Sequence, residues 1–96
     1  GKEAKIVQID RFRLDFKPEG YLLLAPHVDK PNMIGQIATV LGSAGINING
    51  MQVGSTAIEG TNLMAIATSG DIPNDIMLKL RGIEGIIDVK LINCEG

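Results

Sequence analysis

The chain has 96 residues, of which 45% are apolar and 21% are charged, and these values indicate a single small globular domain. Nine basic and eleven acidic residues give a formal net charge of -2. This charge balance argues against the basic patch that binds a phosphate backbone. With only three aromatic residues, the chain also has little from which to build a surface for base stacking.

One cysteine, Cys94, and one histidine exclude an internal disulfide, a Cys-x-x-Cys metal site and a histidine-based zinc shell. This cysteine usage predicts a reducing, cytoplasmic compartment. The longest apolar run covers residues 21–26, far below the roughly 20 residues of a membrane span. The chain starts at Gly1 without an initiator Met, which we interpret as the start of a domain excised from a longer protein.

The first residues predict a leading hairpin. Residues 6–9 and 12–16 are two alternating stretches hinged at residues 10–11, with Phe12, Leu14 and Phe16 on one face of the second stretch and Arg13 and Asp15 on the other.

A central strand is predicted over residues 21–26, which are apolar on both faces. Proline lacks a backbone N–H, so Pro26 is expected at the end of this strand. His27 would then lie in the loop that follows.

A helix is predicted over residues 31–44, with Ile34, Ile37, Ala38, Leu41 and Ala44 on its buried stripe. A proline at its start and Gly45 at its end suit the two helix termini. The two internal glycines, Gly35 and Gly42, are expected to allow close packing on a sheet.

The rest of the chain predicts three strands and a helix. Alternation over residues 46–48 changes phase at Gly50, as a β-bulge would cause, and continues with Met51 and Val53. A turn at residues 59–60 precedes a buried strand over 63–67, and a second helix follows over 72–80. The last strand is expected from Ile87 to Leu91.

A weak internal repeat supports this element order. Residues 29–34 (DKPNMI) recur 42 residues later as 71–76 (DIPNDI), each before a helix that is expected to end near Gly-Ile, at residues 45–46 and 85–86. Two strand-helix-strand units predict an α+β fold, the ferredoxin-like βαββαβ sandwich, with a four-stranded antiparallel sheet and two helices on one face. The leading hairpin or a second subunit would cover the other face.

Few polar residues are candidates for a site. His27 and Asp29 precede a helix N-terminus, where free N–H groups favour an anion, but Asp29 as a cap and His27 as a solvated loop residue are an equally simple interpretation. Asn47 would point to an open sheet face or a neighbouring chain, unless it only ends the helix. The glycines form no nucleotide-binding motif, and the four methionines are expected in the core.

Two stretches carry a resemblance to a known family: YLLLAPHVDKPNMIG at residues 21–35 and LGSAGININGMQVG at residues 41–54. They resemble ACT domains, and among these the C-terminal regulatory domains of D-3-phosphoglycerate dehydrogenases. The resemblance implies that residues 1–19 are a hairpin and linker from a parent enzyme and that residues 20–96 are the regulatory domain.

The resemblance also implies a function. ACT domains bind amino acids, typically between two paired domains, and in these dehydrogenases the ligand is usually L-serine, the feedback inhibitor of its own biosynthesis. By position, His27, Asp29 and Asn47 match ligand-binding residues, and Asn32 stands where the family usually has Gly, so that its side chain would narrow the site or add a contact. No cofactor is expected in this domain, whereas the parent would be an NAD-dependent oxidoreductase.

The proposed roles follow the chemistry of serine. Asp29 and the Asn47 carbonyl would accept from its ammonium group, while His27 and the helix N-terminus would donate to its carboxylate. Two alternatives stay open: the ACT domain of the beta chain of iron-sulfur-dependent L-serine dehydratase, and a dimerisation module without a ligand. A stand-alone enzyme is disfavoured because the sequence shows no nucleophile-base pair, metal constellation or paired carboxylates.

Overall fold

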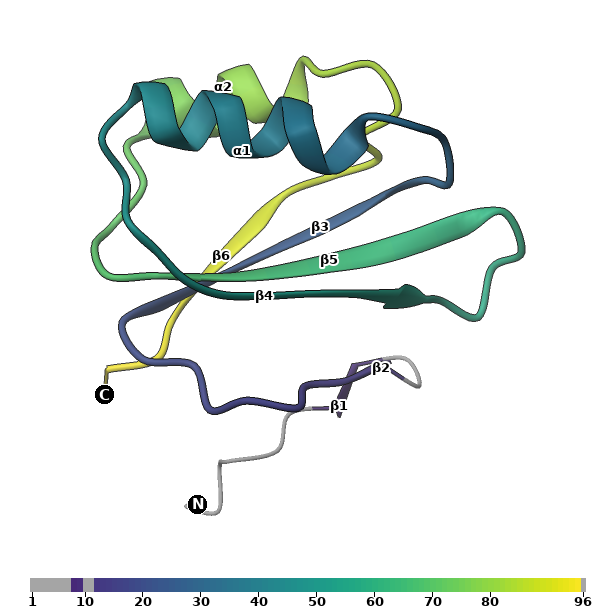
Figure 1. Ribbon diagram of the computed structural model, residues 1–96, viewed down its shortest axis with the longest axis horizontal. Helices are drawn as coiled ribbons and strands as arrows, with labels where there is room; N and C mark the ends of the chain where they lie inside the picture. Colours follow the sequence, from purple (N-terminus) through teal and green to yellow (C-terminus); the bar gives the residue numbers. More distant parts are fainter. Residues whose placement is uncertain (1–7, 10–11, 96) are drawn as a thin grey trace.

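Figure 1 shows a computed structural model of the protein, which describes residues 8–9 and 12–95. Its long strands form one sheet in the order β4-β5-β3-β6, in which all neighbours are antiparallel, and both helices cover one face. This is the predicted ferredoxin-like arrangement. The elements are β1 (Gln8–Ile9), β2 (Phe12–Arg13), β3 (Tyr21–Val28), α1 (Met33–Ser43), β4 (Ile48–Ser55), β5 (Thr61–Thr68), α2 (Asn74–Arg81) and β6 (Lys90–Asn93).

Apolar side chains form a cluster on each face of the sheet. Alternation along the two central strands, β3 and β5, sends successive side chains to opposite faces, so strands that are apolar throughout need cover on both sides. The cluster under the helices includes Leu23, Ile37, Leu41, Met64, Ile66, Ile76, Leu80 and Val89. The cluster on the other face comprises Leu14, Leu22, Leu24, Leu63, Ala65 and Ala67.

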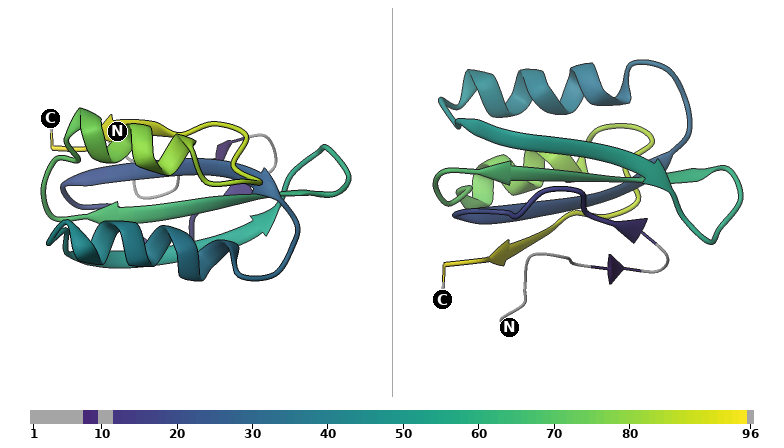
Figure 2. Two further views of the ribbon diagram at one scale, coloured as in Figure 1. Left: turned by 90° about the horizontal axis from the view of Figure 1, so that it is seen from above. Right: turned by 60° about the horizontal axis from the view of Figure 1, so that its bottom comes forward.

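The described part of residues 1–19, called the leading segment below, covers this second face, as the right-hand view of Figure 2 shows. The expected hairpin is present, because β1 and β2 pair with Gln8 opposite Arg13. Residues 6–7 and the hinge at 10–11 lie outside the described residues. The second strand ends at Arg13 rather than at Phe16, but the predicted alternation holds beyond it: Leu14 is buried, while Arg13 and Asp15 are exposed.

Helix α1 begins two residues later than predicted, and its buried face is centred on Met33, Ile37 and Leu41. Ile34, which was expected on this face, is 45% exposed. Gly45 has a φ of 75° and its N–H binds the carbonyl of Gly42, so it ends the helix as predicted.

The expectation that Gly35 and Gly42 allow close packing on the sheet is wrong, because both glycines are exposed. A Cβ at Gly42 would meet nothing within 4 Å. At Gly35 a Cβ would lie 2.7 Å from Oδ1 of Asn32, so that glycine makes room for a side chain of the preceding turn.

Strand β3 does not end at Pro26, in contrast to the prediction, but continues to Val28. The carbonyl of Pro26 accepts a hydrogen bond from the N–H of Ile87 at 2.9 Å, so the proline nitrogen also faces the chain at residues 86–87. The pairing of β3 with β6 ends at Leu24, so the missing N–H of Pro26 costs no hydrogen bond to β6. Because the proline nitrogen points away from β5, no hydrogen bond to β5 is lost either.

Three further expectations have mixed outcomes. The β-bulge is confirmed by a register shift between Ile48 and Gly50. Three methionines are buried as predicted, but Met51 is 38% exposed. The last strand begins at Lys90, and Ile87, expected within it, is 56% exposed.

The repeat at residues 29–34 and 71–76 precedes a helix in both copies, as predicted. The second helix, however, ends at Arg81 with Gly82 as its cap, so Gly85 lies in the loop beyond it. Within the part of the chain that the structure describes, no helix has the length and apolar character that crossing a membrane requires.

Candidate functional site

His27 lies in β3 and is only 3% exposed, so the prediction that it stands in a loop is wrong. Its Nδ1 lies 2.9 Å from the carbonyl oxygen of Ala25. A carbonyl can only accept, so Nδ1 carries the proton, and in the neutral ring Nε2 is a hydrogen-bond acceptor.

His27 opens onto a hollow of about 180 Å³ between the N-terminus of α1 and the ends of β3, β4 and β5. Asp29 is held at its rim by a hydrogen bond from its backbone N–H to the carbonyl of Gly60, at 3.0 Å. The hollow thus combines a carboxylate, an ammonium group, an imidazole and two side-chain amides with apolar side chains. Its lining residues are His27, Asp29, Lys30, Asn32, Met33, Ile34, Gly35, Val53 and Asn62.

Asn32 adopts the left-handed backbone conformation, with φ 69° and ψ 14°, directly before α1. No side chain caps this helix, so the interpretation of Asp29 as a cap is not supported. The first turn contains no acidic residue either. Residues 33–35 line the hollow, and the N-cap side chain makes no hydrogen bond to this first turn, so the N–H groups of the helix N-terminus are available to an anionic group of a ligand.

Asn47 does not reach this hollow. It lies just before β4 and is exposed, and its carbonyl accepts the N–H of Ser69 at 3.1 Å. Ile48 is paired with Thr68, whereas Ser55 and His27 are both paired with Asn62. Asn47 is thus at the opposite end of the eight-residue strand, roughly 25 Å away at the usual rise of a strand.

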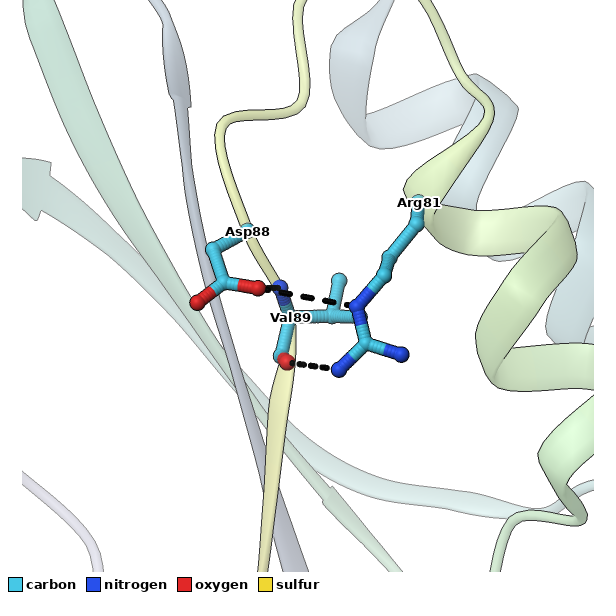
Figure 3. A network of polar contacts seen from close by, with 3 residues as sticks. All are labelled: Arg81, Asp88 and Val89. Carbon is cyan, nitrogen blue, oxygen red and sulfur yellow. Dashed lines mark hydrogen bonds and ion pairs between the residues drawn. The ribbon is translucent and has the colours of Figure 1, made fainter.

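Figure 3 shows how Arg81, at the end of α2, is joined to Asp88 and Val89 in the loop just before β6. Arg81 donates from Nη2 to the carbonyl of Val89 at 3.0 Å, and its Nε lies 3.6 Å from Oδ1 of Asp88. The same loop carries Gly85, whose carbonyl accepts the N–H of Val28 at 2.8 Å. The sequence analysis did not anticipate this support for the strand that carries His27.

The sequence analysis also missed Asn62, Val53 and Ile34 as lining residues. Asn62 lies at the start of β5, directly opposite His27, and only the strand register brings the two together. Position in the fold, rather than any local motif, identifies them.

The described residues contain no group of three or more His, Cys, Asp or Glu side chains that could hold a metal ion. Cys94 lies away from the hollow, in the cluster on the other face of the sheet. Burial, assisted by the negative charge of Glu95, raises the pKa of the Cys94 thiol above its ordinary value.

Comparison with known proteins identifies relatives but no matching family model. D-3-phosphoglycerate dehydrogenase from Methanocaldococcus jannaschii is 36% identical over 88 residues, which are 92% of this chain and 17% of that protein. The enzyme of the same name from Synechocystis is 34% identical over 86 residues, 90% of this chain and 16% of that protein. The chain therefore spans about a sixth of the length of these relatives.

Solved structures agree on the fold. The small subunit of acetolactate synthase from Thermotoga maritima superimposes with a TM-score of 0.64 at 19% identity, covering 76% of this chain and 47% of that one. The ACT domain of GTP pyrophosphokinase from Chlorobium tepidum gives a TM-score of 0.50 at 25% identity, covering 77% of this chain and 97% of that one. The chain has the fold of an ACT domain and is similar over about nine tenths of its length to a segment of D-3-phosphoglycerate dehydrogenases.

Proposed function

We propose that this chain is the amino-acid-sensing regulatory domain of a D-3-phosphoglycerate dehydrogenase, and that it binds L-serine between two copies of itself. The observation that carries the proposal is the hollow around His27 and Asp29, whose lining includes Val53 of the edge strand β4. Its volume of about 180 Å³ suits a small metabolite rather than a larger cofactor.

The lining residues match the groups of an amino acid. The carboxylate of Asp29 and Nε2 of His27 accept from the ammonium group, since the bond from Nδ1 to Ala25 makes the neutral ring an acceptor rather than the donor expected from the sequence. The free N–H groups at the start of α1 receive the carboxylate. Asn32 and Asn62 also line the hollow, and their side-chain amides would contact the serine hydroxyl.

A second copy supplies the missing asparagine. Strand β4 is an edge of the sheet, bonded to β5 on one side and to no described strand on the other. Antiparallel pairing of two β4 strands about a two-fold axis that passes at Met51 would set residue 47 of one copy against residue 55 of the other. The partner subunit's Asn47 then reaches the hollow that holds His27 and Asp29.

Exposed apolar side chains along this edge support such pairing. Ile34 of α1 and Ile48 and Met51 of β4 are 45%, 36% and 38% exposed. Seen from above in Figure 2, α1 runs along the β4 side of the molecule, and Ile34 lines the same hollow as Val53 of β4. Burying them between two copies removes apolar surface from water.

The parent protein is proposed to be an NAD-dependent, cytoplasmic oxidoreductase that makes a precursor of serine. Its nicotinamide cofactor would bind outside the present residues. L-serine then acts as a feedback signal if it binds one arrangement of the parent's domains better than another. The similarity to dehydrogenases over nine tenths of the chain favours this parent over a serine dehydratase.

Subunit mixing tests the shared site. Variants Asp29→Ala and Asn47→Ala each form dimers whose two sites both lack one group, so neither is expected to bind L-serine. Equilibrated together, they form mixed dimers with one intact site, and calorimetry should recover about a quarter of the wild-type number of sites.

Asn49→Ala is the matched control, because Asn49 also lies near the start of β4 but its Oδ1 accepts the hydroxyl of Ser69 at 3.0 Å. It should bind L-serine like the wild type. Failure of the mixture to recover any sites would refute a site shared between copies. Dimers that bind no amino acid, even in the wild type, would identify the domain as a dimerisation module without a ligand.

A further inference from the structure

Besides its apolar contacts with β3 and β5, the leading segment forms side-chain hydrogen bonds with strand β4. The side chain of Gln52 accepts a hydrogen bond from the N–H of Asp15 through Oε1 at 2.8 Å, and its Nε2 donates to the carbonyl of Arg13 at 2.7 Å. These two groups flank Leu14, which is 2% exposed. The Gln52 amide therefore holds the backbone of the leading segment as a neighbouring strand would, with Leu14 turned into the sheet.

A second contact to β4 lies at the bulge. A Cβ at Gly50 would be 2.9 Å from Cε2 of Phe16, so the glycine lets the aromatic ring lie directly on the strand backbone. Gly50 and Gln52 thus share the face of β4 that meets the leading segment. Both belong to the Gly-Met-Gln-Val-Gly stretch at residues 50–54, and neither of them lines the hollow.

The opposite face of the same strand belongs to the ligand hollow. Val53 follows Gln52 directly, and because side chains alternate along a strand, it points to the helix side and lines the hollow. Two consecutive residues of β4 therefore serve opposite faces of the sheet. Val53 lines the hollow, and Gln52 forms the hydrogen bonds with the leading segment. A ligand that restrains Val53 restrains the backbone from which Gln52 extends.

We propose that Gln52 is the positioning residue through which an amino acid in the hollow acts on the leading segment, the part of the chain that precedes the ACT sheet. This inference rests on the proposed function. Ligand bound against Val53 holds β4 in place and strengthens the grip of Gln52 on Arg13 and Asp15. Because such coupling is reciprocal, loss of these two hydrogen bonds must weaken ligand binding by the same factor by which the ligand strengthens them.

Hydrogen exchange of the Asp15 amide in the full chain tests the proposal. Gln52→Met keeps the length of the side chain and removes both hydrogen bonds, and Gln36→Met makes the same change on α1, where Nε2 of Gln36 contacts the carbonyl of Asn32 at 3.3 Å. The Glu95 amide, held by Oδ1 of Asn93 at 2.8 Å, is an internal reference far from β4. Melting curves establish that both variants fold.

We expect L-serine to slow exchange at Asp15 about fivefold in the wild type and in Gln36→Met, with no change at Glu95. In Gln52→Met, Asp15 should exchange faster without ligand and should not respond to L-serine, which should bind about fivefold more weakly. L-serine that binds the wild type and Gln52→Met equally, without an effect on Asp15, overturns the coupling and leaves the proposed function intact. A wild type that binds no L-serine overturns the proposed function and, with it, the coupling.

Discussion

Asn32 illustrates how one residue combines a backbone requirement with a place in the site. Its φ of 69° makes it the single non-glycine residue with positive φ among those described. Asparagine tolerates this conformation better than most residues, which explains how it occupies a position where the family usually has glycine. Its side chain, which reaches Gly35, lies at the edge of the hollow.

Replacing Asn32 separates these two roles. Asn32→Ala should lower the free energy of unfolding by about 1 kcal/mol, because alanine adopts the left-handed backbone conformation less readily than asparagine. Asn32→Gly should stay within about 0.5 kcal/mol of the wild type while it widens the hollow. Urea unfolding of the three proteins measures both effects, and an alanine variant as stable as the wild type would contradict the assignment of strain.

The sequence identified candidate residues better than it located them. His27 and Asp29 do line one hollow, but His27 is buried in a strand and Asn47 is at the far end of the sheet. Asn62 could not be predicted, because only the register between β3 and β5 places it opposite His27. Local patterns identify side chains, whereas distances between them follow from pairings of residues far apart in the chain.

At the scale of elements, hydrophobic periodicity predicted all four long strands and both helices. The errors concentrate where local rules compete with tertiary pairing. Pro26 was expected to end its strand because it has no N–H to donate. The strand continues because the chain at residues 86–87, which lies beside Pro26, donates to the proline carbonyl instead. The glycines of α1 resembled packing positions, but only the structure shows that they face away from the sheet.

Two glycine substitutions test this account of the elements. Gly42→Ala should raise the free energy of unfolding by about 1 kcal/mol, because the site is helical, exposed and open. Gly20→Ala should lower it by about 2 kcal/mol or more, because Gly20 has a φ of 87° and a Cβ there would lie against the backbone carbonyls of Thr68 and Ser69. Thermal and urea unfolding measure both, and a destabilised Gly42→Ala would show that the helix face is packed after all.

On the scale of the whole molecule, the sheet is covered on both faces, and of its two edge strands, β4 and β6, it is β4 that lines the hollow. The helices protect one face and the leading segment the other, so β4 with the neighbouring flank of α1 is the surface suited to a second copy. This explains why one chain separates residues that the proposed site needs together. The boundary between a linker at 1–19 and a domain at 20–96 stays a prediction, although Leu14 is part of the second core cluster.

A charge on the β4 edge tests the proposed dimer. Met51→Lys should weaken self-association at least about tenfold, because pairing would bury an unpartnered ammonium group. Leu78→Lys is the matched control, since Leu78 is 64% exposed on α2, away from β4. Sedimentation velocity over a range of concentrations measures both, and equal association of the two variants would place the dimer interface elsewhere.

Two copies of this chain are proposed to bind L-serine between them, and calorimetric titration of the full chain is the decisive experiment. L-serine should give saturable binding with one site per chain, while D-serine should give none and glycine weaker binding. Sedimentation of the same samples should show a dimer. A dimer that releases no heat with any of these amino acids would contradict the binding of L-serine between two copies and leave the β4 edge as an assembly surface alone.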